Sequence, residues 1–278
     1  MRNNKNFCYY TIAFLVLSSC KDNVTITKTS NEFIPPFVKQ KLKTDSITEQ
    51  DYQSVTSSNF IVAVKTFATD TLLISSDNYQ DSTIYNDLYR KIYDTAWNNI
   101  SFDGFEIIPN YITTVYREDK LGTNKLLRFY PIYLINKSSI DKYYRGKDGH
   151  AFGIQEALDS TGVWRPIEGQ GFDFCGNGYW NLKIRANESL VLLAPKYEGD
   201  YKTQMRVRLK VGNINYISRP FAGTINYNQF YIPLDSYYTR MLKRDKAAAI
   251  QEVFYGAVPL EIKTNKVVSH AVVAQQSY

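Results

Sequence analysis

Alternation of apolar and polar residues predicts β-strands in most of the chain beyond residue 105. The clearest cases are residues 180–184 and 204–211, where every second side chain is apolar. In the longer segment the apolar positions are Met205, Val207, Leu209 and Val211. Successive side chains of a strand point to opposite faces of a sheet, so each of these strands has one apolar face. A second sheet covers such a face most economically, which predicts a β-sandwich.

Turn-forming residues between strand-like runs predict three β-hairpins in the same part of the chain. The paired strands are expected at residues 105–116 with 126–136, 152–156 with 163–167, and 172–175 with 179–180. Gly122, Gly162 and Asn177-Gly178 lie in the intervening turns. Glycine and asparagine favour the backbone angles that tight turns require, and short strands at this spacing are typical of a sandwich.

In two segments the spacing of apolar residues is that of an amphipathic helix and not of a strand. Between residues 81 and 98, apolar side chains recur at every fourth position beside a stripe of tyrosines, which predicts a helix with one wide apolar face. Residues 244–256 predict a short helix that begins at Asp245 and ends at Gly256. Further short strands are predicted at residues 60–64, 71–75 and 257–262.

The first twenty residues have the pattern of an export signal. Arg2 and Lys5 precede an uncharged, apolar run at residues 8–17. About 20 apolar residues are needed to span a bilayer as a helix, so this run is too short and predicts a secretory signal peptide. Its end, Leu17-Ser18-Ser19-Cys20, resembles the bacterial lipobox, in which the cysteine becomes the N-terminus and carries lipid. That resemblance implies lipidation of Cys20, whereas a plain signal peptide would leave a free thiol there.

Two further features resemble proteins exported by Bacteroidota. Lys21-Asp22-Asn23 is similar to the charged stretch of their surface lipoproteins, which implies an outer-membrane protein exposed on the cell surface, with the periplasmic face as the alternative. Their O-glycosylation motif places Ser or Thr after Asp and before a small or aliphatic residue. It is matched at Ser46, Thr71, Ser82, Thr95 and Ser160. The same dipeptides favour helix caps and turns, so a purely structural role is the alternative.

One segment refines the predicted fold. Residues 186–201, followed by the amphipathic strand, resemble the E–F region of immunoglobulin-like sandwiches, where a Gly-x-Tyr forms a tyrosine corner. Gly199 and Tyr201 occupy those positions, and Tyr201 is expected to face inward. Trp180 lies on the same face of its predicted strand as Leu182, so its ring is expected in the core. The predicted fold class is therefore mainly β, an immunoglobulin-like β-sandwich with a small α+β N-terminal region and a short C-terminal helix.

The chain is expected to divide into six segments. In order, these are a signal peptide at 1–19, a lipidated flexible tether at 20–57, an α+β region packed on the sandwich at 58–125, the β-sandwich at 126–234, a C-terminal helix and strand at 235–264, and a tail at 265–278. The tether is expected to be flexible because its polar residues offer few buried contacts. Its apolar island, Phe33–Val38, is expected to dock on the body or on a partner.

Composition and charge narrow the chemistry. The 278 residues include 2 histidines and 3 cysteines, which excludes a multi-histidine metal centre and a disulfide framework. Cleavage after residue 19 would remove Arg2 and Lys5 and no acidic residue, so the net charge falls from +6 to +4. Such a mild surplus, without a block of like charges, does not indicate nucleic-acid binding. No nucleotide-binding or serine-hydrolase motif occurs, so we expect no cofactor and no catalytic residues.

Binding is better supported than catalysis. Aromatic and basic side chains near predicted turns and on the polar face of residues 204–211 form the candidate binding surface. It comprises Trp164, Tyr179, Arg206, Arg208 and Lys210. The alternatives are core positions for the aromatic residues and a solvated sheet face for the basic ones.

The sequence thus predicts a non-catalytic, outer-membrane-anchored lipoprotein. Its expected partners are the outer membrane, through lipid on Cys20, and another outer-membrane or surface protein in nutrient uptake, protein export or outer-membrane protein assembly. The second interpretation is a surface glycan-binding module of a polysaccharide-utilisation system. A secreted hydrolase is the third.

Overall fold

The computed structural model describes residues 33–41, 52–58, 60–66, 71–75, 104–118, 126–147, 150–171, 178–211 and 214–260. The larger sheet contains β3 (Phe60–Thr66), β5 (Phe105–Pro109), β6 (Val115–Glu118), β7 (Leu126–Asn136), β8 (Lys142–Lys147), β9 (His150–Ala151), β13 (Tyr179–Ile184) and β14 (Ser189–Pro195). The smaller sheet contains β10 (Gly153–Leu158), β11 (Trp164–Pro166), β15 (Tyr201–Val211), β16 (Ile214–Ile217) and β17 (Phe221–Ile225). Two short parallel pairs join β1 (Phe37–Lys41) to β4 (Thr71–Ser75) and β2 (Thr56–Ser57) to β12 (Glu168–Gly169). The 3₁₀ helix η2 (Tyr227–Phe230) and the α-helices α2 (Tyr237–Arg244) and α3 (Lys246–Glu252) follow the strands.

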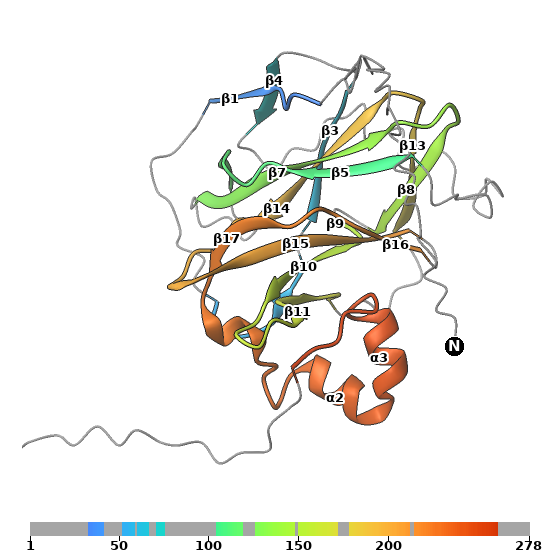
Figure 1. Cartoon of the computed structure of the whole chain (residues 1–278). Coiled ribbons are helices and arrows are strands. Elements are labelled where there is room, and N and C mark those ends of the chain that lie inside the picture. The colour runs from blue at the N-terminus through green and yellow to red at the C-terminus, as the bar shows by residue number, and fades with distance from the viewer. Residues whose placement is uncertain are drawn as a thin grey trace, which may run out of the picture. The chain divides into compact units, whose positions relative to one another are not determined.

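Strands that are distant in the sequence pair within both sheets (Figure 1). The larger sheet has the order β13-β8-β9-β3-β14-β7-β5, with β6 also paired to β7. In the smaller sheet the long strand β15 pairs with β10 along one edge and with β16 and β17 along the other. The pairings within the two described sheets are antiparallel. The prediction of a mainly β fold with sandwiched sheets and a short C-terminal helix is confirmed.

The two sheets pack face to face through one apolar core. Phe60, Tyr130 and Trp180 of the larger sheet meet Val207 and Leu209 of β15 in the same buried cluster. Trp180 is 1% exposed, which agrees with its parity, and the apolar positions of residues 205–211 are all buried. Burial of these large side chains stabilises the sandwich because the free energy gained scales with the apolar area removed from water.

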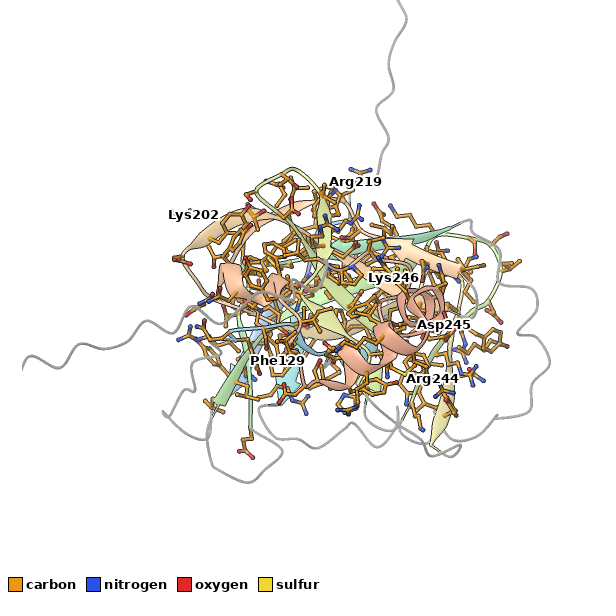
Figure 2. The ribbon with its side chains drawn as sticks, turned by 90° about the horizontal axis from the view of Figure 1, so that it is seen from below. Phe129, Lys202, Arg219, Arg244, Asp245 and Lys246 are labelled. Atoms are coloured by element: carbon orange, nitrogen blue, oxygen red, sulfur yellow. The ribbon has the colours of Figure 1, made fainter. Side chains whose placement is uncertain are left out.

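The C-terminal segment, residues 237–260 with α2 and α3, covers the outer face of the smaller sheet. Ile154 of β10, Tyr238 of α2 and Phe254 after α3 share a second buried cluster. Asp245 separates the helices, and its side chain accepts a 3.0 Å hydrogen bond from the backbone N–H of Ala248 at the start of α3. Figure 2 shows this junction at Arg244, Asp245 and Lys246. The sequence pattern located the start of α3 but missed α2, whose tyrosines favour strands as strongly as helices.

Residues 257–260 do not form the predicted strand. The carbonyls of Val258 and Pro259 instead accept hydrogen bonds from the Arg165 guanidinium, at 3.3 and 3.4 Å. Proline has no N–H to donate to a strand ladder. A side chain of the smaller sheet therefore holds this segment where backbone pairing was expected.

The prediction of a flexible tether as far as residue 57 is wrong at two places. Residues 37–41 form β1, and the side chain of Gln40 exchanges hydrogen bonds with the backbone of Tyr116. Val55 is 3% exposed, and its N–H donates to the carbonyl of Tyr231 at 2.9 Å. One buried apolar side chain and a few backbone bonds are sufficient to fix a short polar segment. The predictions for residues 1–19, 81–98 and 265–278 concern residues outside the described ones.

Within the region expected at 58–125, the described strands β3, β5 and β6 belong to the larger sheet. The single strand expected at 105–116 is divided into β5 and β6, which both pair with β7. The chain turns between them at Asn110, whose side-chain oxygen accepts a 3.3 Å hydrogen bond from the N–H of Thr113. Asparagine favours such turns because its side chain replaces a backbone acceptor.

A substitution at Gly146 would test the packing of the core. It lies opposite Trp180 in the β8–β13 ladder, and a Cβ atom there would lie 2.1 Å from Cζ2 of that ring. We expect Gly146→Ala to lower the free energy of unfolding by about 2 kcal/mol, because overpacking a core costs about 1–3 kcal/mol. Urea unfolding measures the change. Gly171→Ala is the matched control, since its Cβ would meet no described atom closer than 3.6 Å, and equal stability of the two variants would contradict the contact.

Candidate functional site

A pocket of about 350 Å³ opens where the two sheets and the C-terminal segment meet. Its lining comprises Arg145, Lys147, Phe152, Gln170, Gly171, Tyr179, Lys210, Tyr237, Glu252, Val253 and Tyr255. These residues come from β8, β13, β15, α2, α3 and the adjoining connections. Because the site draws on segments more than 100 residues apart in sequence, no local motif marks it.

Cations and aromatic rings are interleaved on one wall of the pocket. Tyr179 lies opposite Lys147 in the β8–β13 ladder. The guanidinium carbon of Arg145 lies 4.4 Å from the centroid of the Tyr179 ring, and the Lys147 amine lies 4.9 Å from it. Burial lowers the pKa of Arg145, while the Coulombic interaction with Tyr179 raises it. An arginine side chain keeps its charge under all ordinary conditions, so this wall is cationic.

Lys210 and Glu252 contribute an ion pair to the lining. The Lys210 amine lies 3.1 Å from Oε2 of Glu252, 3.2 Å from the carbonyl oxygen of Gln251 and 5.3 Å from the ring centroid of Tyr255. The Glu252 side chain is 72% exposed, whereas that of Lys210 is 19% exposed. The ion pair therefore lies at the mouth of the pocket, with its carboxylate toward solvent.

The other members of the predicted binding surface have a structural role. Arg206 and Arg208 both form ion pairs with Glu156, at 2.8 and 3.1 Å, and this carboxylate is 1% exposed. Arg208 also donates to the carbonyl of Tyr255 at 3.3 Å. The guanidinium of Arg206 stacks on Trp164, 4.3 Å from the ring centroid. These two arginines and Trp164 are thus engaged with Glu156 and with one another on the outer face of the smaller sheet.

Sequence reasoning found two of the pocket residues and missed the rest. Tyr179 and Lys210 belonged to the predicted surface. Arg145 and Lys147 share one face of β8 and could have been found from the alternation in residues 142–147. Tyr237 and Tyr255 carry no such signal, because they reach the pocket only through the fold of the C-terminal segment.

A buried carboxyl, that of Glu168, is not among the described residues that line the pocket. The side chain of Glu168 is fully buried and accepts hydrogen bonds from the Tyr197 hydroxyl at 2.5 Å and from the Gln155 amide at 2.8 Å. The backbone N–H of Gln155 donates to its second oxygen at 2.8 Å. Burial raises the pKa of Glu168 from its usual 4.5 to about 7, although the hydrogen bonds from Tyr197 and Gln155 lower it. The group therefore changes charge near neutral pH.

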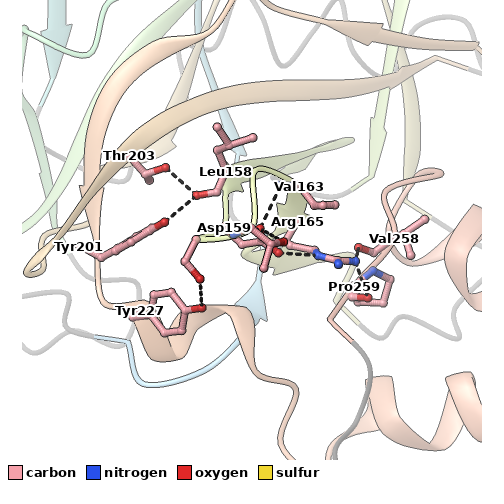
Figure 3. A network of polar contacts seen from close by, with 11 residues as sticks. Leu158, Asp159, Val163, Arg165, Tyr201, Thr203, Tyr227, Val258 and Pro259 are labelled. Carbon is pink, nitrogen blue, oxygen red and sulfur yellow. Dashed lines mark hydrogen bonds and ion pairs between the residues drawn. The ribbon is translucent and has the colours of Figure 1, made fainter.

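One candidate glycosylation site, Ser160, lies in the β10–β11 turn, directly after Asp159, which Figure 3 labels. The residue before it, Asp159, accepts hydrogen bonds from Thr161, Val163 and Arg165 at 2.6–3.0 Å. Burial raises the pKa of Asp159, but these hydrogen bonds together lower it to about 2. The Asp-Ser-Thr sequence thus has a structural explanation as a turn, and Ser160 remains exposed, with its hydroxyl 3.0 Å from that of Tyr227.

Tyr201 bonds to a backbone carbonyl earlier in the chain, but this acceptor belongs to the neighbouring strand β10. Its hydroxyl donates to the carbonyl of Leu158 at 3.2 Å, and Thr203 donates to the same oxygen at 2.6 Å (Figure 3). The ring packs against the buried cluster that contains Met205, so it faces inward as expected. The acceptor lies at the end of β10, 43 residues earlier, and not in the few residues that precede a local tyrosine corner.

Of the remaining candidate sites, the structure describes one, Thr71. Cys20, Ser46, Ser82 and Thr95 lie outside the described residues, as does the hairpin predicted around residues 172–177. Thr71 is the first residue of β4.

Within the described part of the chain, none of the helices has the length and apolarity needed to cross a bilayer. In the same residues, no three His, Cys, Asp or Glu side chains are grouped so that they could hold a metal ion. Comparison with models of protein families, with curated proteins and with solved structures finds no match.

The raised pKa of Glu168 makes stability depend on pH. Between about pH 4.5 and 7 the folded protein keeps a proton that the unfolded chain has lost, so the stability from this group is full below pH 4.5 and is lost as the pH rises through 7. The expected loss is about 3 kcal/mol, from about 1.4 kcal/mol per pKa unit. Urea unfolding from pH 5 to 8 should show a slope in the parent protein that Glu168→Gln lacks.

Glu198→Gln is the control for that comparison, because the Glu198 side chain is 57% exposed. It should retain the slope of the parent protein. Parallel pH profiles for the parent and Glu168→Gln would contradict the assignment. The difference between the two profiles is the quantity that matters, because other titrating groups contribute equally to both.

Proposed function

We propose that this chain is a non-catalytic lipoprotein anchored in the outer membrane through lipid on Cys20. The observation that carries the proposal is the order of residues at the N-terminus, where two cations and an uncharged run at residues 8–17 precede Cys20. That run is shorter than a bilayer-spanning helix. Several acyl chains on one cysteine exceed the two-signal threshold for stable anchoring, so the covalent lipid would hold the body at the membrane.

The proposed role of the body is to bind another envelope protein. Two packed sheets provide a rigid scaffold, and the pocket presents cations and aromatic rings from its edge. Of the acidic residues that a hydrolase could draw on in this region, Asp148 and Asp173 lie outside the described residues. The described ones, Glu156, Asp159 and Glu168, are each engaged by arginine, glutamine or tyrosine side chains. These contacts favour structural roles for them. The proposal therefore places the protein on the cell surface as an accessory subunit in nutrient uptake, protein export or outer-membrane protein assembly.

A glycan-binding module is the second candidate, favoured by the aromatic rings of the pocket. Trp180 is buried and one face of Trp164 is covered by Arg206, so neither offers an open stacking platform. Among the described residues, Tyr179 and Tyr237 of the pocket are then the rings on which a sugar could stack. Retention of the purified protein on an immobilised polysaccharide, abolished by Tyr179→Ala, is the result expected of this candidate. Passage through a panel of such columns without retardation would remove it.

Replacement of Cys20 tests the anchor. Cys20→Ala should move the protein from the membrane fraction to the soluble fraction, because no acyl chain could then be attached. Cell fractionation measures the distribution, and mass spectrometry of the N-terminal peptide measures the lipid. Cys8→Ala and Cys175→Ala are matched controls that should remain in the membrane fraction.

Two results would overturn this proposal. A free thiol at Cys20 in the processed protein, or a Cys20→Ala variant that still sediments with membranes after a high-salt wash, would refute lipid anchoring. Recovery of the detergent-solubilised protein alone from an affinity purification of outer membranes would refute the accessory role.

A further inference from the structure

We propose that the pocket between β8, β13, β15 and the C-terminal segment is a binding site for a small ring-bearing organic anion, one that carries a carboxylate or a phosphate. The proposal goes beyond the membrane-anchored accessory role. It stands on the composition and geometry of the pocket and does not depend on lipid at Cys20.

The charge of the pocket argues for an anion. Among the described residues that line it, Arg145, Lys147 and Lys210 are cationic, and Glu252 is the single carboxylate. Arginine and lysine pair with carboxylate and phosphate oxygens through short, charge-assisted hydrogen bonds. Glu252 already illustrates this chemistry, because its own carboxylate lies 3.1 Å from the Lys210 amine.

The carboxylate of Glu252 can be displaced. Its side chain is 72% exposed at the end of α3, and exposed ion pairs contribute little to stability. The Lys210 amine is held on the other side by the carbonyl of Gln251 and lies over the ring of Tyr255, so it keeps its position when Glu252 moves away. Glu252 therefore acts as an internal competitor for the ligand anion.

The size and aromatic content of the pocket argue for a ring rather than an inorganic ion. A volume of about 350 Å³ lies within the range of small-molecule sites and far exceeds that of one phosphate. Among the described lining residues, four are aromatic and lie alongside the cations. Aromatic rings bury apolar surface at a low cost in conformational entropy, so they stabilise the non-ionic body of a ligand while the cations hold its charge.

The experiment is a set of titrations of the purified, processed protein in detergent at low salt. The probes are D-glucuronate and glucose 6-phosphate, with neutral glucose and inorganic phosphate as controls, and isothermal titration calorimetry reads the dissociation constants. Both ring-bearing anions should saturate one site at least tenfold more tightly than either control. The affinity should fall as salt is added, because screening weakens the charge contacts.

Variants assign the binding to this pocket. Lys210→Gln should weaken binding of both anions at least fivefold, and Glu252→Gln should strengthen it about threefold because the competing carboxylate is gone. Lys202→Gln is the matched control, since Lys202 is an exposed lysine on the same strand and lies well away from the α2–α3 junction (Figure 2). Circular dichroism of each variant reports whether the fold is intact.

Three results would overturn the proposal: no saturable binding of either anion at millimolar concentration, inorganic phosphate binding as tightly as the ring-bearing anions, or unchanged affinity in a folded Lys210→Gln variant. None of these results bears on membrane anchoring by Cys20. Loss of the anchor, in turn, would leave the titrations unaffected, so the two proposals fail separately.

Discussion

The buried carboxylate of Glu156 and its two arginines control how the outer face of the smaller sheet is organised. The apolar face of β15 is committed to the core between the sheets, which leaves Arg206 and Arg208 on the opposite face. Cations on a covered face require an anion, because an unpaired buried charge is very unfavourable. Glu156 provides it from the neighbouring strand β10, where it lies directly opposite Arg206 in the ladder.

That interaction also positions the C-terminal segment. Besides its ion pair with Glu156, Arg208 donates a hydrogen bond to the carbonyl of Tyr255. Lys210, two residues further along β15, donates a hydrogen bond to the carbonyl of Gln251 at the end of α3. The same row of basic residues therefore links the sheet to the segment that completes the pocket. Replacement of Glu156 would accordingly affect the pocket as well as the sheet, although Glu156 does not line it.

Sequence patterns predicted those parts of the fold that depend on local periodicity. The alternation in residues 180–184 and 204–211 placed their side chains correctly, because the period of two is a property of a single strand. The turn at Asp159–Gly162 was predicted for the same reason, since Asp159 makes its turn contacts within six residues. Strand order, in which β14 lies between β3 and β7, follows from packing between distant segments, so no local pattern encodes it. The short strand β2 escaped prediction because it depends on a partner, β12, more than 100 residues away.

The same distinction, between local periodicity and packing of distant segments, applies to the candidate site. Alternation showed that Arg206, Arg208 and Lys210 share one face. Their partners on that face lie 41 to 52 positions away in the sequence, so the pattern could not show which of these cations reaches the pocket. The first two of these cations pair with Glu156, and only Lys210 reaches the pocket. The group that titrates near neutrality, Glu168, is not among the described residues that line the pocket. A change of pH between 5 and 8 is therefore expected to alter the stability of the sandwich through this buried carboxyl.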